Sequence, residues 1–134
     1  MAGTIQLDIV TPERLLVSEA VDEVIAPGSE GEFGVLPGHC RFLTTLRIGE
    51  LRYRQGEQWK RLSVSWGFAE VEPRRITVLA DIAERAEEID LPRAEAAAKT
   101  AELQIAAASK HEEMEAARAQ LEKALLRLKV GKRR

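Results

Sequence analysis

The sequence is poor in cysteine, histidine and long apolar runs, and each shortage excludes a class of protein. Its one cysteine, Cys40, cannot form an internal disulfide. The two histidines are far apart, and His39 directly beside Cys40 does not have metal-ligand spacing, so we expect no metal site. No apolar run reaches the roughly 20 residues of a membrane helix, which predicts no direct membrane insertion.

The net charge gives no support for a nucleic-acid-binding protein, and the residue pattern gives none for an enzyme. The net charge of −2 at pH 7 lacks the basic excess that marks nucleic-acid-binding domains, so no nucleic-acid partner is expected. Ser63 and Ser65 lie in a strand pattern and not in the strand–turn–helix sequence of a nucleophile elbow. The chain is therefore predicted not to be an enzyme.

The first 80 or so residues alternate apolar and polar side chains with a period of two. The apolar members of the three clearest runs are Ile5, Leu7 and Ile9; Leu62, Val64 and Trp66; and Ile76, Val78 and Ala80. Such alternation places one side of each strand in a core and the other in water, so these residues are expected to face inward. Turn signals such as Thr11-Pro12, Pro37-Gly38 and Gln55-Gly56 separate the runs. Many short strands at this spacing predict a sandwich or a barrel.

The pattern changes near residue 90. Residues 93–130 contain no glycine and no proline, and strong helix formers dominate. Asp90, just before Leu91-Pro92, is suited to accept a hydrogen bond from a first-turn N–H, and proline is tolerated there. We therefore expect a strand-rich part and a helical part to meet near residues 84–90.

Two apolar seams run along the helical part. The first consists of Leu91, Ala94, Ala98, Ala101, Ile105 and Ala108, and the second of Met114, Ala117, Leu121, Ala124 and Leu128. Each follows one helix face, but the step of six between them puts the seams out of phase. A turn around Ser109-Lys110-His111 would let them face each other in a hairpin, whereas one unbroken helix would extend roughly 57 Å. A segment with two such arrangements is a candidate switch.

The stretch GSEGEFGVLPGH, residues 28–39, contains four glycines, and its role stays open at this point. A phosphate cradle is disfavoured because no Gly-Lys-Ser/Thr follows and the next residues have a strand pattern. The glycines can simply supply turns with positive φ. Alternatively, the stretch is a recognition loop on a rigid sheet, with Glu30 and Glu32 exposed.

The chain ends on a basic segment, KALLRLKVGKRR. Cations in a last helical turn interact favourably with the negative end of the helix dipole. They also suit an electrostatic contact with an acidic partner, and the residues alone do not separate the two roles.

Four motifs occur in a characteristic order along the whole chain. They are TPER after the first strand pattern, GSEGEFGVLPGH, ITVLAD at the end of the strand-rich part, and the junction AERAEEIDLPRA. Together they resemble the epsilon subunit of bacterial rotary ATP synthase. Trp66 departs from the resemblance, since the family commonly has glycine there. The resemblance implies a mainly β plus α fold, with an N-terminal antiparallel β-sandwich over residues 1–86 and a C-terminal two-helix antiparallel hairpin over residues 87–134.

The resemblance also implies a non-catalytic rotor subunit of a proton-translocating ATP synthase. In the family, the sandwich binds the gamma subunit and the ring of c subunits. The helical domain folds back or extends toward the alpha and beta subunits of the catalytic head, where it inhibits ATP hydrolysis. The implied location is the cytoplasmic face of the bacterial cell membrane, where the subunit is peripheral and held through the complex.

The residues implied for these contacts follow position by position. The expected c-ring contacts are Ser29, Glu30, Gly31 and Glu32, and the expected gamma contacts are His39 and Thr44. The expected inhibitory basic face consists of Arg118, Lys123 and Arg127, followed by the terminal KRR.

The junction further resembles the I/L-D-x-x-R-A motif of family members that bind ATP as a regulatory ligand. The matching residues are Glu84, Ile89, Asp90, Arg93 and Ala94, and Arg127 matches one basic residue that family binders bring to the phosphates. A capped helix start explains Asp90 and Pro92 without a ligand. No cofactor is therefore required, and ATP binding is one of two open interpretations.

A second hypothesis comes from a different class of protein. It describes a free-standing β-sandwich ligand-binding module whose helical tail dimerises as a coiled coil. This hypothesis predicts a two-fold assembly that dissociates when residues beyond 90 are removed. The rotor hypothesis instead predicts that the isolated chain is a monomer whose seams pair internally.

Overall fold

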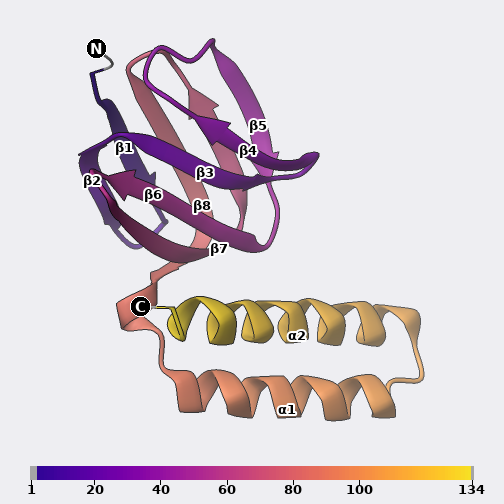
Figure 1. Ribbon diagram of the computed structural model, residues 1–134. Helices are drawn as coiled ribbons and strands as arrows, with labels where there is room; N and C mark the ends of the chain where they lie inside the picture. Colours follow the sequence, from indigo (N-terminus) through magenta and orange to yellow (C-terminus); the bar gives the residue numbers. More distant parts are fainter. Residues whose placement is uncertain (1–2, 134) are drawn as a thin grey trace. The chain divides into compact units, whose positions relative to one another are not determined.

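The computed structural model describes residues 3–133, and the chain divides between Arg85 and Ala86 into two compact units (Figure 1). The strands described in the first unit are β1 (Ile5–Val10), β2 (Leu15–Val21), β3 (Glu23–Gly28), β4 (Gly31–Val35), β5 (Phe42–Leu46), β6 (Gly49–Gln55), β7 (Gln58–Val71) and β8 (Arg75–Arg85). The second unit begins with a 3-10 turn over Ala86–Glu88 and continues with the helices α1 (Leu91–Ala107) and α2 (His111–Gly131).

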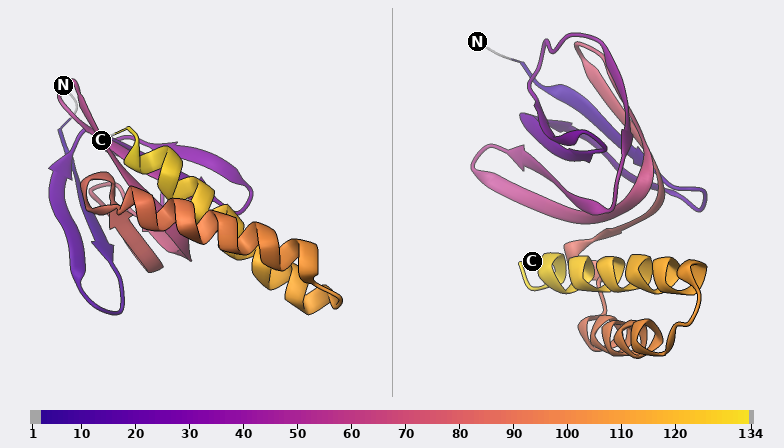
Figure 2. Two further views of the ribbon diagram at one scale, coloured as in Figure 1. Left: turned by 90° about the horizontal axis from the view of Figure 1, so that it is seen from below. Right: turned by 90° about the vertical axis from the view of Figure 1, so that its right-hand side faces the viewer.

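The strands of the first unit form two layers that share the long strand β7 (Figure 2). Residues 58–64 of β7 pair with β6, whereas residues 67–71 pair with β5, so the strand passes from one layer to the other. The strand β8 pairs with β7 on both sides of this bend. Beyond β8 lie β1 and β2, and β3 carries β4 at the opposite edge.

One strand pair differs from the antiparallel arrangement expected for the sandwich. The strands β1 and β8 run parallel, with Leu7 opposite Ile76 and Ile9 opposite Val78. They are the first and last strands of the unit, so no tight turn joins them and the intervening chain allows a parallel return. The other strand pairs in the described residues are antiparallel. The predicted fold class, a β-sandwich followed by two helices, is confirmed.

The core lies between the two layers and confirms most of the predicted alternation. The predicted inward residues that are buried are Ile5, Leu7, Ile9, Leu62, Val64, Ile76, Val78 and Ala80. Burial of apolar surface at about 25 cal/mol per Å² drives this inward placement.

The prediction that Trp66 faces the core is wrong. Its side chain is 43% exposed, whereas Ser65 beside it is only 6% exposed. Trp66 has a φ of 53° and Gly67 a φ of 147°. These two positive angles turn the strand over, so even-numbered residues such as Val64 face inward before the bend and odd-numbered residues such as Ala69 face inward after it. A regular alternation cannot anticipate a bend at which inside and outside exchange.

The helices α1 and α2 lie side by side as an antiparallel hairpin (Figures 1 and 2). The two predicted seams face each other, and their buried members are Ala94, Ala98, Ala101, Ala117 and Ala124. The chain turns at residues 108–110, as the phase shift between the seams predicts. Of the two arrangements that the sequence permits, a hairpin and one extended helix, the structure has the hairpin.

Local signals fix the start of α1. Asp90 is the N-cap, and its side chain accepts a hydrogen bond from the Arg93 backbone N–H at 3.1 Å, as predicted. Pro92 lies in the first turn, where its missing N–H would have no helical partner. The end of the basic tail, Arg134, lies outside the described residues.

Candidate docking surfaces and helical junction

The glycine-rich stretch forms the β3–β4 hairpin, which turns at Ser29 and Glu30. Gly28 pairs with Gly31, and Gly31 has a φ of 132°. A Cβ on Gly28 would lie 2.8 Å from the Gly31 carbonyl oxygen and 2.9 Å from the Phe33 ring. Gly31 is therefore needed for its backbone angle, and Gly28 is needed because other atoms approach its Cα closely.

The predicted c-ring contacts lie together at this turn, but their side chains have different surroundings. The Ser29 N–H donates to the Thr45 carbonyl oxygen at 2.9 Å. The Glu32 carboxylate forms an ion pair with Arg52 at 3.1 Å. Glu30 is exposed at the tip of the turn, and no side-chain partner for it occurs within residues 3–133. Only one of the two glutamates is thus available to a partner without breaking an internal contact.

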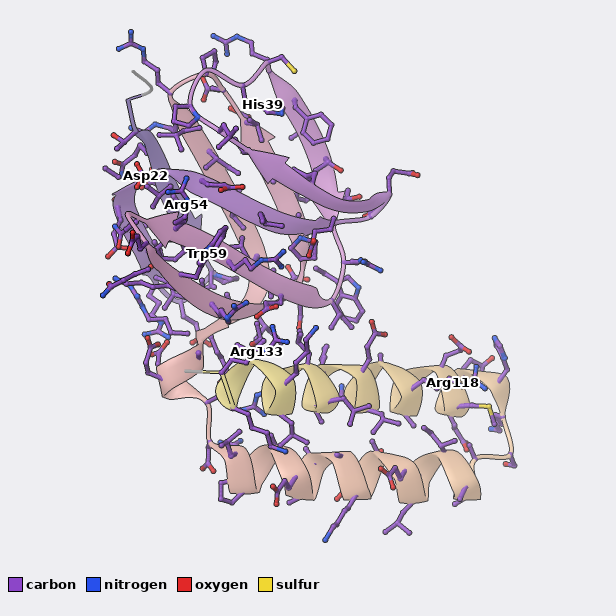
Figure 3. The ribbon with its side chains drawn as sticks, in the orientation of Figure 1. Asp22, His39, Arg54, Trp59, Arg118 and Arg133 are labelled. Atoms are coloured by element: carbon purple, nitrogen blue, oxygen red, sulfur yellow. The ribbon has the colours of Figure 1, made fainter. Side chains whose placement is uncertain are left out.

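The predicted gamma contacts lie in and after the loop that joins β4 to β5. His39, in this loop, is half-buried, and its Nδ1–H donates to the Cys40 carbonyl oxygen at 2.7 Å (Figure 3). Its ring is also 6.4 Å from that of Phe42. Thr44 pairs with the buried Ala69, so its half-buried side chain is on the inward side of β5.

The structure reveals an exposed apolar row that the sequence reasoning missed. Leu43, Phe68 and Leu79 are 68%, 53% and 51% exposed and project from the neighbouring strands β5, β7 and β8. Phe68 is directly opposite Leu79, and Leu43 is opposite Glu70, two residues further along β7 and therefore on the same face. A signal for this row was present in the sequence, because these strands carry apolar residues at adjacent positions. Such a pattern predicts that both faces of the layer are covered by other protein surface. Exposed apolar rows of this kind mark interaction surfaces.

The junction residues matched to the ATP-binding motif have structural roles in the helical unit. Ile89 is 2% exposed and belongs to a small core with Ala86 and Val130. Ala94 is fully buried in the seam, whereas Arg93 is exposed. Helix capping and packing thus account for most of the motif. Glu84, on β8 in the sandwich, lines a shallow pocket with Thr11 and Arg14.

The three cations of the predicted basic face do not share one face of α2. At 3.6 residues per turn, Arg118 lies about 140° around the helix axis from Lys123 and about 180° from Arg127. The Arg118 side chain is 61% exposed (Figure 3) and is 3.6 Å from Glu115. Lys123 and Arg127 are half-buried. This geometry corrects the expectation of a single basic face. The inhibitory role of the three residues stays a prediction.

One buried phenol, Tyr53, and one half-buried carboxyl, Asp8 on the outward side of β1, have shifted pKa values. Burial, and then the hydrogen bond that the Tyr53 hydroxyl donates to Glu19 at 2.7 Å, raises the pKa of Tyr53. Burial also acts to raise the pKa of Asp8, but hydrogen bonds from its neighbours and the Arg75 guanidinium outweigh it and hold that pKa below its ordinary value. Both groups are thus held by contacts between neighbouring strands of the sandwich.

The sequence matches two domains of one protein family, in order along the chain. The β-sandwich domain of the ATP synthase delta/epsilon chain matches residues 4–86, and the long alpha-helix domain of the same chain matches residues 87–132. This chain belongs to the ATP synthase delta/epsilon-chain family. The family resemblance predicted from the four motifs is confirmed.

Relatives of this ATP synthase family match the chain from end to end. The ATP synthase epsilon chain of Syntrophobacter fumaroxidans is 50% identical over 133 residues, covering 99% of each chain. The ATP synthase epsilon chain of Geobacter metallireducens is 49% identical over 132 residues, covering 98% of this chain and 96% of the relative.

Solved structures of ATP synthases contain chains of the same fold. A chain in the Euglena gracilis mitochondrial ATP synthase structure of OSCP, F1 and c-ring has a TM-score of 0.81 at 23% identity, covering 93% of this chain and 79% of that one. A chain in the Tetrahymena thermophila mitochondrial central stalk and c-ring structure has a TM-score of 0.63 at 12% identity, covering 95% and 96%. At these identities the likeness concerns the fold alone.

Two features of this family member concern membranes and metals, within the residues that the structure describes. No helix within them is both long and apolar enough to cross a membrane. Between residues 3 and 133, no three His, Cys, Asp or Glu side chains gather where they could hold a metal ion.

Proposed function

We propose that this chain is a non-catalytic rotor subunit of an F-type ATP synthase, which joins the gamma subunit to the c-ring and restrains ATP hydrolysis through its helical hairpin. The observation that carries the proposal is the match of both family domains in order, with epsilon chains about half identical over nearly the whole length. In this proposal the subunit is peripheral, at the cytoplasmic face of the membrane, and the enzyme activity belongs to the complex.

The sandwich carries two surfaces suited to the two docking partners. The row of Leu43, Phe68 and Leu79 offers apolar area of the kind that stable protein interfaces bury, and we assign it to the gamma subunit together with the nearby His39 loop. The β3–β4 turn, with Ser29 and Glu30 at its tip, is small and polar, and we assign it to the loops of the c-ring.

The helical hairpin is the proposed regulatory part. Its paired seams hold the two helices together. Residues 93–130 contain no glycine or proline that would prevent them from forming one longer helix. An extended form would bring Arg118, Lys123 and Arg127 along the alpha and beta subunits of the catalytic head. There they would interact with acidic side chains and hold the rotor against hydrolysis.

ATP as a regulatory ligand is a separate part of the proposal. Arg93 is the matched residue that is exposed and has a charge suited to a phosphate, while Asp90 caps the helix. Calorimetry with millimolar ATP tests this directly. The intact chain should give a binding signal that Arg93→Ala abolishes, and the absence of any signal with the intact chain would leave only the capping role.

Truncation tests the proposed division of labour. A chain ending at Ile89 keeps the sandwich and its docking surfaces and lacks both seams and the basic tail. Added to synthase depleted of this subunit, it should restore assembly and give faster ATP hydrolysis than the full chain does. Pull-down of the gamma subunit by both forms supplies the control for docking. Unchanged hydrolysis by a fully assembled complex would contradict the regulatory role.

The alternative of a dimerising ligand-binding module loses its main support in the structure. The seams that a coiled-coil dimer would need already face each other between α1 and α2 of one chain, and five of their alanines are buried there. We therefore propose that the isolated chain is a monomer, which sedimentation of the full chain tests.

A further inference from the structure

We propose that the end of α2 holds the hairpin closed by packing on the junction that precedes α1, and that this closure depends on Val130 and Gly131. The effect of this contact on hydrolysis rests on the proposed regulatory function of the hairpin. The contact itself is a property of the isolated chain, and it lies beyond the alanines of the seams.

A small apolar cluster, the junction cluster, lies where α2 ends beside the start of α1 (Figure 1). Its buried members are Ala86, Ile89 and Val130, which are 2%, 2% and 0% exposed. The half-buried Leu91 and Leu126 pack against them. These branched side chains bury more apolar area per residue than the seam alanines do, so the cluster contributes strongly to closure for its size.

The junction cluster can exist only while the hairpin is closed. It joins residues that precede or begin α1 to residues of the last turns of α2. At about 1.5 Å per residue, one continuous helix would place Val130 roughly 58 Å from Leu91. Every contact of Val130 with the junction is therefore lost on extension, and its free energy counts fully toward the closed form.

Gly131 lets α2 approach the junction closely. It is buried in the last turn of α2, and a Cβ there would lie 2.7 Å from Leu91 Cδ2 and 3.1 Å from Ile89 Cγ2. The Leu91 methyl can rotate away, but Ile89 is branched at Cβ and 2% exposed, so it has little room to move. A side chain at residue 131 would therefore push the end of α2 away from the junction.

The other end of the hairpin is packed less tightly. The seam residues nearest the turn, Ile105, Ala108 and Met114, are only half-buried. A pocket of about 390 Å³ opens between the two helices there, and the polar Gln104 and Gln120 help to line it. Dense apolar packing is thus concentrated at the junction end, which makes that end the one that controls closure.

The test measures how often a buried seam position becomes accessible in the full chain. In a Cys40→Ser background, Ala101→Cys places a thiol at a position that is 1% exposed in the closed hairpin. Ala101 lies about 15 Å along α1 from Leu91, so local fraying at the junction would leave it covered. The rate at which this thiol reacts with a soluble reagent therefore reports opening of the whole hairpin.

Variants of the junction cluster should react faster. Val130→Ala and Ile89→Ala should each raise the labelling rate about tenfold, because each removes apolar atoms from the cluster. Gly131→Ala should raise it about three- to tenfold through overpacking. Residue 131 is helical in the hairpin and would be helical in an extended helix, so the higher helix propensity of alanine affects both states alike. Leu125→Ala is the matched control on the same helix, because Leu125 is 51% exposed, and it should change the rate less than about twofold.

A double variant tests the close approach at Gly131 itself. Leu91→Ala removes the methyl group that an added Cβ would meet at 2.7 Å. Gly131→Ala should therefore raise the labelling rate less in the Leu91→Ala background than in the chain that keeps Leu91. Circular dichroism of each variant shows whether the helices are still formed, which separates opening of the hairpin from unfolding of α1 or α2.

Three outcomes would overturn the inference. The first is an unchanged labelling rate in Val130→Ala, Ile89→Ala and Gly131→Ala. The second is an equally large rise in Leu125→Ala, which would show that closure is not concentrated at the junction. The third is a rise that comes only with loss of the helical signal, because unfolding would then be its cause.

ATP hydrolysis separates failure of this inference from failure of the proposed function. Synthase reconstituted with Val130→Ala should hydrolyse ATP more slowly than synthase with the unaltered chain, because a more frequently open hairpin inhibits more often. Faster labelling of the isolated chain together with unchanged hydrolysis would support the junction cluster as the closing contact. The same result would contradict the regulatory role proposed for the hairpin.

Discussion

The bend of β7 at Gly67 should tolerate no side chain, and Gly67→Ala tests this. A Cβ at Gly67 would lie 2.0 Å from the Leu79 carbonyl oxygen, whereas ordinary contact begins at 3.4 Å, so β8 would have to move by about 1.4 Å. The φ of 147° is also one that side-chain-bearing residues rarely adopt. Backbone strain of about 1–3 kcal/mol and overpacking of about 1–3 kcal/mol together predict a loss of roughly 2–6 kcal/mol of unfolding free energy.

Urea unfolding at pH 7, followed by fluorescence of the sandwich, measures this loss. The matched control is Gly34→Ala, where the added Cβ has nothing within 4 Å and the φ is not positive. The control should stay within about 0.5 kcal/mol of the unaltered chain. The reasoning is refuted if Gly67→Ala unfolds at the same urea concentration as Gly34→Ala, because the strand pair would then have room that the structure does not show.

Three further predictions concern single contacts. Tyr53→Phe should lower the unfolding free energy at pH 7 by about 2 kcal/mol in urea titration, because the Glu19 carboxylate loses its hydroxyl donor. A loss of unfolding free energy no larger than that caused by substituting an exposed residue would contradict this. The pKa of Asp8 is lower in the folded chain, so its carboxylate contributes stability that is present above the ordinary pKa near 3.8 and is lost as the pH falls through the folded value. Asp8→Asn should therefore destabilise the chain at pH 7, and acid unfolding should show that this effect disappears below that pH window. Asp90→Ala should cost about 1 kcal/mol in thermal unfolding followed by helical circular dichroism, while Asp90→Ser retains the cap; equal melting of both variants would argue against the capping role.

The helical half could be predicted closely because its signals are local. Asp90 caps α1, five of the six seam alanines are buried, and the turn falls at residues 108–110. Each of these follows from spacing within a few residues of the chain, and helix geometry converts spacing directly into a face. The same logic corrects the basic face, because residues 118 and 123 are five apart and five residues do not return to one side of a helix.

The sandwich could be predicted only where its strands are regular. The alternation around Leu7 and Val78 holds, but it fails at Trp66, where two consecutive positive φ angles exchange the faces of β7. The exposed row of Leu43, Phe68 and Leu79 depends on which strands are neighbours, and strand order is not encoded in a period-two pattern. The same is true of the Glu32–Arg52 pair, since twenty residues separate its members in sequence.

The composition of the hairpin seams bears on whether the proposed switch is physically reasonable. Each of the five buried seam alanines removes one methyl-sized group from water, worth about 0.8 kcal/mol, or about 4 kcal/mol for these five residues. Leucines at the same positions would contribute about 1.5–3 kcal/mol each and would hold the hairpin far more firmly. Shifting a two-state equilibrium from 99:1 to 1:99 requires about 5.5 kcal/mol. Alanines at the buried seam positions therefore hold the closed form less firmly than leucines would, which favours an opening within the range of free energy that contacts with a partner protein can supply.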